Sequence, residues 1–395
     1  MKIITRTVWM LSAVSLLTDV ASEMLYPVVP VYLRSIGFSI FLIGILEGIA
    51  EATAGLSKGY FGKLSDNTGK RLPFVRLGYA LSALSKPMMA FFTSIAWVFS
   101  VRTLDRLGKG IRTGARDALL SDEATPQTKA RVFGFHRGMD TFGAVLGPAI
   151  ALLFLSLYPG QYKTLFYIAF IPGVLAIFFT FAIKEKLRAT SPTKKATRLL
   201  DFLRYLEASP LEYRKLVTGL LLFALFNSSD IFLILKIKES GFSDTSAIGV
   251  YIFYNLIYAL CAYPLGSLAD RIGLRTVFLS GLVLFAAVYA GMAVNTNLYL
   301  FYGLFLLYGV YAAATEGITK AWITNVAAKQ YTATAIGTYT ALQSICTMLA
   351  STITGALWFA FGAKVMFLIT ALMAIIALVY FLVFVRGIRA GKGSH

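Results

Sequence analysis

The sequence is poor in charged residues, and this scarcity excludes a soluble globular protein. Charged residues make up 14% of the 395 residues, whereas soluble domains contain about 25%. Hydrophobic residues make up 57% of the chain, the mean hydropathy is +0.72, and the apolar residues occur in runs long enough to cross a bilayer. We therefore expect a multi-pass membrane protein.

Cysteine and histidine are also scarce, and this argues against metal chemistry. The two cysteines, Cys261 and Cys346, lie in apolar runs without ligand spacing, and His136 is the only histidine before the final residue. A bound metal, a transition-metal substrate or a cofactor is therefore not expected. The sequence contains neither a phosphate-cradling Walker motif nor a nucleophile and base at catalytic spacing, so we expect neither ATP-driven transport nor an enzyme.

Acidic residues are outnumbered by basic ones, 19 against 37, which gives a net charge of +18. The basic residues gather in alternate loops between the apolar runs, and this is the pattern that encodes membrane topology. We therefore expect membrane lipids, and not nucleic acid, to be the partner of this charge.

Apolar runs separated by charged or Gly/Pro-containing turns indicate twelve transmembrane helices. The runs begin near Val8, Ile40, Phe74, Ala96, Arg131, Thr164, Lys215, Ser246, Arg275, Leu298, Ala333 and Lys364. The predicted fold is an all-α membrane protein with two pseudo-symmetric six-helix lobes, residues 1–184 and 214–395. We expect a monomer in a bacterial inner (plasma) membrane, with the basic linker and both termini cytoplasmic.

The linker, residues 185–213, contains a short amphipathic segment. Its apolar stripe lies between Arg198 and Arg204 and consists of Leu199, Leu200, Phe202, Leu203 and Leu206. Such a stripe is typical of a helix lying on the inner leaflet, and equally of a helix packed on the protein's own cytoplasmic face. Both interpretations stay open at this point.

An internal repeat supports the two lobes. The segment 62–71, GKLSDNTGKR, recurs as the segment 266–275, GSLADRIGLR, 204 residues later. Each copy lies between two long apolar stretches. A repeat with a period of about half the chain indicates duplicated membrane halves, as found in secondary transporters.

The two copies resemble motif A of the major facilitator superfamily, Gly-x-Leu-Ala-Asp-Arg-x-Gly-Arg-Lys. The matching positions are Gly62, Leu64, Asp66, Gly69, Lys70 and Arg71 in the first copy and Gly266, Leu268, Ala269, Asp270, Arg271, Gly273 and Arg275 in the second. The resemblance implies the superfamily fold, nearest to its twelve-span proton-coupled efflux type, and a conformational latch at each copy. It makes Asp66, Arg71, Asp270 and Arg271 gating candidates. We expect Arg112 and Arg116 to form a latch with Asp66.

A second resemblance concerns the fifth predicted helix. The segment from Gly143 through Gly147 to Pro148 resembles motif C of proton-coupled exporters, although Ile150 and Ala151 replace the usual glycines. These residues are gating candidates. A packing face of small residues with a proline kink explains them equally well.

Charged residues inside the predicted helices are the candidates for proton coupling or substrate binding. They are Asp19, Glu23, Glu47, Glu51, Arg102, Asp105, Arg106, His136, Arg137 and Asp140. Arg102 resembles the arginine of motif B, and Glu47, Glu51 and Asp105 resemble the acidic cluster of sodium-coupled melibiose-type symporters. Intramembrane charges are functional by default, with a static ion-pair network as the alternative. At least one acid of each i, i+4 pair should meet a cation or hold a proton.

The second half offers mainly neutral polar and aromatic candidates: Asn227, Asp230, Tyr251, Tyr254, Asn255, Glu316 and Gln343. The tyrosines can line a cavity wall for an organic ligand or simply pack inside the bundle.

These features together predict a secondary transporter for a small organic solute, ionisable or amphiphilic, that works by alternating access. The leading hypothesis is proton-coupled export. The alternative is proton- or sodium-coupled uptake of a small solute, and a third hypothesis is a lipid flippase or sensor.

Overall fold

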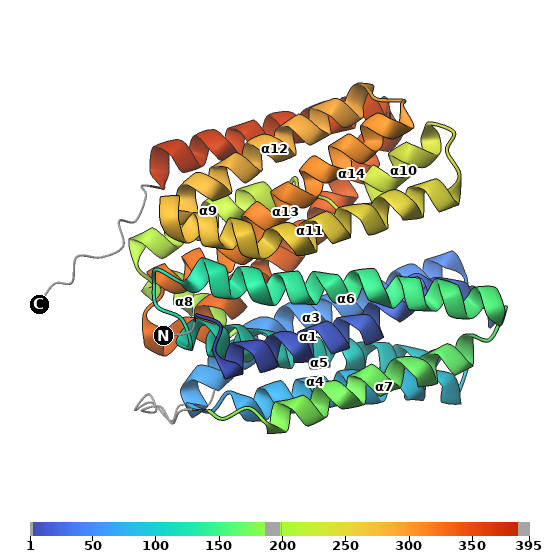
Figure 1. The fold of residues 1–395 in the computed structure, drawn as a ribbon, viewed down its shortest axis with the longest axis horizontal. Helices are drawn as coiled ribbons and strands as arrows, with labels where there is room; N and C mark the ends of the chain where they lie inside the picture. The colour runs from blue at the N-terminus through green and yellow to red at the C-terminus, as the bar shows by residue number, and fades with distance from the viewer. Residues whose placement is uncertain (1–2, 186–197, 199, 386–395) are drawn as a thin grey trace, which may run out of the picture. The chain divides into compact units, whose positions relative to one another are not determined.

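The computed structural model describes residues 3–185, 198 and 200–385, and within these ranges it contains helices and no strand (Figure 1). The chain divides into two compact units. Unit 1 comprises residues 1–123, 139–208 and 328–341, and unit 2 comprises residues 124–138, 209–327 and 342–395. Each unit thus contains one short segment from the opposite half of the sequence. The continuous lobe boundaries stay a prediction.

The helices of the first half are α1 (Arg6–Leu25), α2 (Val28–Ser35), α3 (Ile40–Thr68), α4 (Leu72–Phe91), α5 (Ile95–Asp122), α6 (Lys129–Leu157) and α7 (Tyr162–Phe181). The linker forms the 3-10 helix η1 (Asp201–Leu203) and the short helix α8 (Arg204–Ala208). The second half contains α9 (Leu211–Ala224), α10 (Ile231–Glu239), α11 (Asp244–Ile272), α12 (Leu274–Val294), α13 (Leu298–Val326), η2 (Lys329–Tyr331) and α14 (Thr332–Phe384).

These helices make up the twelve predicted spans, and each begins close to its predicted start. The first span is interrupted between α1 and α2, where Pro27 follows Tyr26, and the seventh is interrupted between α9 and α10. Helix α14 contains the last two spans, which meet at Gly362 with a φ of 80°. Among the described residues, seven segments are long and apolar enough to cross a membrane by length and composition alone.

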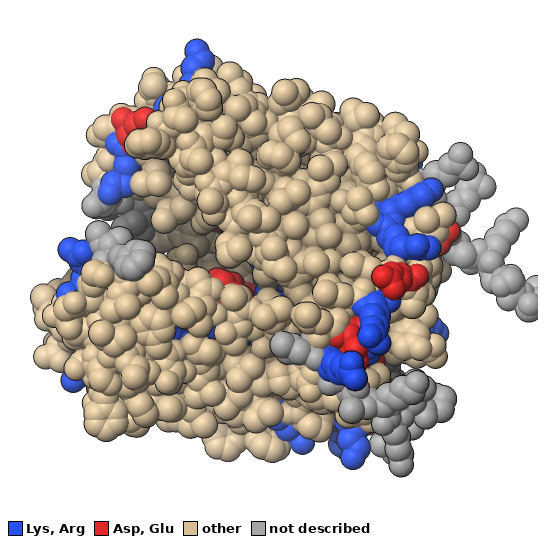
Figure 2. Space-filling model, turned by 180° about the vertical axis from the view of Figure 1, so that it is seen from behind, with Lys and Arg blue, Asp and Glu red and all other residues tan. Residues whose placement is uncertain are grey.

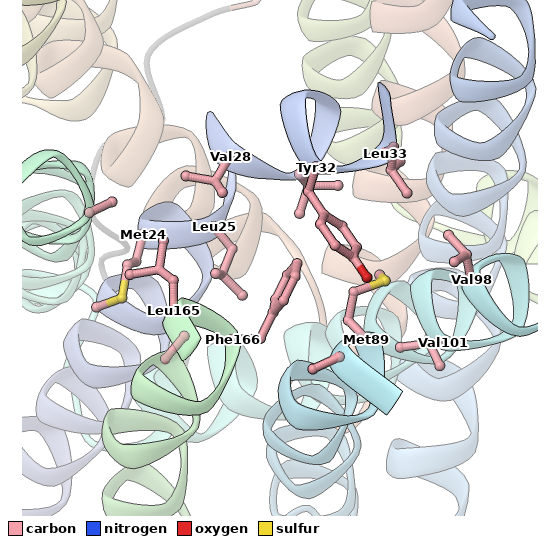
Figure 3. Packing of buried hydrophobic residues seen from close by; sticks show 14 of the residues in the cluster. Met24, Leu25, Val28, Tyr32, Leu33, Met89, Val98, Val101, Leu165 and Phe166 are labelled. Carbon is pink, nitrogen blue, oxygen red and sulfur yellow. The ribbon is translucent and has the colours of Figure 1, made fainter. Parts of the chain in front are cut away.

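A buried apolar cluster holds one end of unit 1 together (Figure 3). Its members come from all seven helices α1 to α7, and the rings of Tyr32 and Phe166 meet edge to face with their centroids 5.1 Å apart. Met89 of α4 lies beside the Tyr32 ring (Figure 3).

On the face seen in Figure 2, charged side chains gather mainly toward the left and right edges, and most of the surface between them is uncharged apart from a small charged patch. An uncharged surface suits contact with the hydrocarbon core of a bilayer, which excludes unpaired charges.

Candidate functional site

The two repeated motifs perform the same structural task in their respective units. Asp66 lies in the last turn of α3, and its carboxylate accepts hydrogen bonds from the backbone N–H groups of Ala333 and Thr334, at 3.3 and 2.6 Å. Asp270 lies in the last turn of α11 and accepts from the N–H groups of Ala130 and Arg131, at 3.1 and 3.0 Å. Each aspartate therefore caps the free N–H groups at the start of another helix, α14 or α6.

A glycine four residues before each aspartate permits this docking. A Cβ atom on Gly62 would lie 2.5 Å from the carbonyl oxygen of Ala333, and one on Gly266 would lie 2.4 Å from that of Ala130. Both distances are shorter than any normal contact. The motif thus combines a glycine for close approach with an aspartate for capping, and it does so twice.

The residues that follow the aspartates behave differently in the two copies. Arg71 is only 1% exposed, and its guanidinium contacts Asp66 at 3.2 Å and Asp122 at 2.7 Å. Its backbone N–H donates to Glu185 at 2.7 Å. By contrast, Arg275, the equivalent residue of the second copy, donates to the backbone carbonyl groups of Phe381 and Leu382, at 3.1 and 2.9 Å, and Arg271 is exposed to solvent. A buried ion-pair network therefore accompanies the first copy.

The expected pairing of Arg112 and Arg116 with Asp66 is wrong. Arg112 donates to Ser82 at 2.6 Å and lies over the Tyr79 ring, 4.5 Å from its centroid. Arg116 is bound to Asp117 at 2.9 Å. Both arginines lie before the last turn of α5, where their side chains meet other residues of unit 1. Asp122, at the end of that helix, is the α5 residue that joins the Asp66 network.

Replacing Arg71 with methionine is expected to destabilise the protein by about 3–5 kcal/mol, because Asp66 would lose its cation while still buried. The matched control is Arg204→Met, since Arg204 is 76% exposed and its pair with Asp201 spans 3.7 Å. An exposed pair of this kind contributes about 0.2–1 kcal/mol. Thermal unfolding followed by tryptophan fluorescence compares the variants. Adding Asp66→Asn to Arg71→Met should restore part of the loss, and no restoration would contradict the explanation.

A charge network joins α3, α4 and α5 in unit 1. Arg102 makes two hydrogen bonds to Glu47, at 2.8 and 2.9 Å, and Arg106 lies 3.5 Å from Glu51. Lys86, which sequence reasoning missed, donates to Asp105 at 3.0 Å. The expectation that an acid of each close pair meets a cation is thus confirmed for Glu47 and Glu51. Lys86 could have been found as a lone lysine within an apolar run.

Asp19 on α1 and Asp140 on α6 interact electrostatically, and a Cβ atom on Gly143, one turn after Asp140, would lie 2.9 Å from the Cβ atom of Asp19. Ser15 donates to Asp140 at 2.5 Å and accepts from Arg116 at 3.2 Å. Glu23 lies one turn beyond Asp19 and interacts electrostatically with Lys109. The structure therefore brings together two predicted acids from helices that are far apart in sequence.

Close packing of α6 against α1 places these two acids near each other. A Cβ atom on Gly143 would lie 2.6 Å from the carbonyl oxygen of Leu16, and one on Gly147 would lie 2.6 Å from the backbone nitrogen of Met24. Pro148 follows inside the same helix. The packing interpretation accounts for both glycines, and their gating role stays a prediction.

Unit 2 contains a second polar group at the break between α9 and α10. The Asp230 carboxylate accepts hydrogen bonds from the hydroxyl groups of Tyr254 and Tyr308, at 2.7 and 2.6 Å. Asn227 donates to the hydroxyl group of Tyr311 at 3.0 Å. These residues come from the helix break, α11 and α13.

Arg137 forms a separate ion pair in unit 2, 3.7 Å from Glu316, and it donates to the hydroxyl group of Tyr258 at 2.6 Å. His136 and Asn255 are buried, Asn255 donates to the Tyr251 carbonyl, and Gln343 lies on α14. The ring of Tyr251 in turn packs against that of Tyr254, with their centroids 5.5 Å apart.

The linker packs on the protein itself. Phe202 is 2% exposed, its ring lies against Gly59 of α3, and its carbonyl accepts from Thr338 of α14 at 3.1 Å. Lys63 donates to the Asp201 carbonyl at 3.0 Å. The burial of Phe202 therefore favours the interpretation in which the linker packs on the protein's own face. Leu200 of the same apolar stripe is 54% exposed, and residue 199 lies outside the described residues.

Electrostatics in the linker follow from this packing. Burial raises the pKa of Tyr205 to about 12, and its ring centroid lies 5.8 Å from that of Tyr331. A hydrogen bond from the backbone N–H of Arg198 holds the pKa of Asp201 below its usual range. The Tyr205 hydroxyl therefore stays protonated at neutral pH, and Asp201 stays ionised.

Comparison with known proteins agrees with this geometry. A family model described as Major Facilitator Superfamily matches residues 11–256 and 216–394. The chain is 31% identical over 380 residues to an uncharacterized MFS-type transporter of Methanocaldococcus jannaschii, covering 95% of this chain and 94% of that one. It is 25% identical over 157 residues to the quinolone resistance protein NorA of Staphylococcus aureus, covering 40% and 39% of the two chains.

Solved structures share the fold. The crystal structure of the human organic anion transporter MFSD10 matches with a TM-score of 0.77 at 18% identity, covering 95% of this chain and 98% of that one. The structure of the transporter FucP matches with a TM-score of 0.78 at 12% identity, covering 96% and 98%. With its duplicated capping motif, twelve spans and these similarities, the chain belongs to the major facilitator superfamily of membrane transporters.

Proposed function

We propose that this transporter exports small organic solutes in exchange for protons. The proposal is carried by the proximity of Asp19 to Asp140, which follows from the close approach of α1 and α6 at Gly143 and from the hydrogen bond between Ser15 and Asp140. Two carboxylates close together inside a protein repel each other strongly, so such a pair binds one proton between them. Intramembrane acids of this kind mark proton relays in transporters.

Release of the proton would change the contact between α1 and α6. Lys109 lies close enough to interact with Asp19, and Arg116 reaches the Asp140 side through Ser15. These cations stabilise the charged pair after the proton leaves. Because Gly143 holds α6 within contact of α1, repulsion between the two acids acts directly on the packing of these helices.

Helix α6 connects the acid pair to one of the two latches. Asp140 follows Ala130 by ten residues, and Asp270 caps the helix at Ala130. Ten residues of α-helix span about 15 Å. A shift of α6 on proton release therefore moves the capped helix start, which is how proton binding would drive alternating access.

The direction of transport rests on two resemblances. The segment from Gly143 to Pro148 is similar to the motif of proton-coupled exporters, and the chain shares 25% identity over 157 residues with a quinolone resistance protein. The experiment uses wild-type proteoliposomes containing the pH dye pyranine, with the membrane potential clamped and ethidium as the added solute. Proton exchange predicts ethidium accumulation in vesicles with an acidic interior, coupled to proton exit.

Other outcomes would assign a different function. Accumulation only in vesicles with an alkaline interior indicates proton-coupled uptake, and accumulation driven by a sodium gradient at constant pH indicates sodium coupling. The ion pairs of Glu47, Glu51 and Asp105 with arginine and lysine argue against sodium, because a sodium ion would have to displace those cations.

A further inference from the structure

The break in the seventh span places a single carboxylate between two half-helices. Helix α9 ends at Ala224 and α10 begins at Ile231, and Asp230 is the residue immediately before α10. Discontinuous helices of this kind form binding sites in many transporters, because the unwound backbone and the helix ends present polar groups to a ligand. The chemistry of the side chains around the break decides which ligand is favoured.

Asp230 is held by neutral donors alone. Its two oxygens accept from Tyr308 and Tyr254, at 2.6 and 2.7 Å. Among the described residues, no lysine or arginine forms an ion pair with it. The acids of unit 1 differ in this respect, since Glu47, Glu51 and Asp105 each meet a cation there. The side chain of Asp230 is therefore the acid of this group without a lysine or arginine partner in the part of the chain that the structure describes.

The two phenol donors occupy only part of the carboxylate. A carboxylate offers about four acceptor positions, and the tyrosines use one on each oxygen. Tyr254 and Tyr308 are themselves buried, so they fix the orientation of Asp230. An oriented carboxylate with free acceptor positions is suited to a ligand that brings positive charge.

Aromatic rings surround the same carboxylate. Ring centroids lie 5.5 Å apart for Tyr251 and Tyr254, 5.3 Å for Tyr254 and Tyr308, and 5.3 Å for Tyr308 and Tyr311. The faces of tyrosine rings attract organic cations, and the attraction grows when the cation is desolvated. The rings therefore favour a positively charged ligand, as the Asp230 carboxylate does, and they add affinity for the apolar part of that ligand.

We propose that Asp230, Tyr254 and Tyr308 bind the positively charged group of an organic cation, which would be the class of solute that this transporter carries. The inference rests on the proposed function, since it names the substrate class of the exporter. A bound cation would give the Asp230 carboxylate the charged partner that no lysine or arginine of the described residues supplies.

The test compares two probes of equal shape and opposite charge, tetraphenylphosphonium and tetraphenylborate, by calorimetry on the purified full-length protein. Wild-type protein is expected to bind the phosphonium at least tenfold more tightly than the borate. Asp230→Asn should weaken phosphonium binding at least tenfold and remove the preference. The matched control is Glu239→Gln on α10, which removes the charge of a half-exposed side chain and should change binding less than twofold.

Two further variants keep the test decisive. Asp230→Glu retains the charge and should keep the preference for the phosphonium, even where Asp230→Asn is poorly folded. Tyr308→Phe removes one hydroxyl donor and should weaken phosphonium binding about three- to tenfold. Equal binding of both probes, no phosphonium binding by wild-type protein, or unchanged binding by Asp230→Asn would overturn the proposal.

The result is independent of proton coupling, because binding is measured without a gradient. Charge-selective binding that requires Asp230, combined with no response to a pH gradient, would support the cation site and reject the proton exchange. Proton-driven ethidium transport, together with phosphonium binding that is unchanged in Asp230→Asn, would support the proton exchange and reject the cation site. Loss of proton-driven transport in Asp230→Asn with full phosphonium binding would make Asp230 a proton site and overturn the inference.

Discussion

Replacing Asp140 with asparagine is expected to abolish proton-driven transport and leave the protein folded. Asparagine retains a side-chain donor for Asp19 and an acceptor for Ser15, so the contact between α1 and α6 survives. The pair then has a single acid and no carboxylate repulsion that would respond to a proton. We expect the proton flux that ethidium drives in pyranine-loaded proteoliposomes to fall at least 100-fold, since coupling through this pair requires both acids. Asp19→Asn should have the same effect.

The controls separate this pair from the other intramembrane charges. Glu239→Gln removes a half-exposed carboxylate and should leave the proton flux within twofold of wild type. Asp105→Asn removes a carboxylate that is bound to Lys86. It should therefore lower the unfolding temperature and have little effect on the proton flux that ethidium drives. Full coupling in Asp140→Asn would reject this pair as the proton relay, and loss of coupling in Asp105→Asn alone would place the relay on α5 instead.

The helices and the repeated motif could be predicted from the sequence because both depend on local patterns. Apolar runs and turn residues locate the spans, and even the exceptional φ at Gly362 lies between the two predicted starts Ala333 and Lys364. The roles of Asp66 and Asp270 as gating candidates came from a motif of ten residues. Local sequence, however, does not tell which helix an aspartate in such a motif will cap.

Partners across helices were the part that sequence reasoning missed. The spacing of charges on α5 shows that they share a face, but it does not show which helix lies opposite. The sequence therefore does not identify Lys86 as the partner of Asp105, and it does not distinguish Arg71 from Arg112 and Arg116 as the partner of Asp66. In fact Asp66 contacts Arg71, which lies only five residues away.

The interruption of the seventh span was equally hidden. The segment Asn227-Ser228-Ser229-Asp230 is polar and therefore weakens the helix, yet polar residues also occur inside intact helices that line a cavity. Asp230 was a candidate on composition alone. Its hydrogen bonds to Tyr254 and Tyr308 depend on the packing of α11 and α13 around the break, and such long-range packing is not encoded in any local pattern.

Replacing Gly62 with alanine is expected to open the contact between α3 and the start of α14. The added Cβ atom would lie 2.5 Å from the Ala333 carbonyl oxygen, and a backbone atom cannot move aside as a flexible side chain can. Overpacking of this kind costs about 1–3 kcal/mol, which is about a 5- to 150-fold shift in the equilibrium of the contact. Under the predicted gating role of this contact, ethidium transport should fall by a similar factor.

Hydrogen exchange at the helix start measures this effect directly. The amides of Ala333 and Thr334 donate to Asp66, so their exchange should accelerate about 5- to 150-fold in Gly62→Ala. Gly44→Ala is the matched control, because a Cβ atom on Gly44 of α3 meets no other atom within 4 Å. The repeat makes the same prediction for Gly266→Ala at the start of α6, with Gly303→Ala as its control. Unchanged exchange in both glycine variants would show that the aspartates cap these helices without close approach of the backbones. The glycines of the repeated motif would then have no role in this contact.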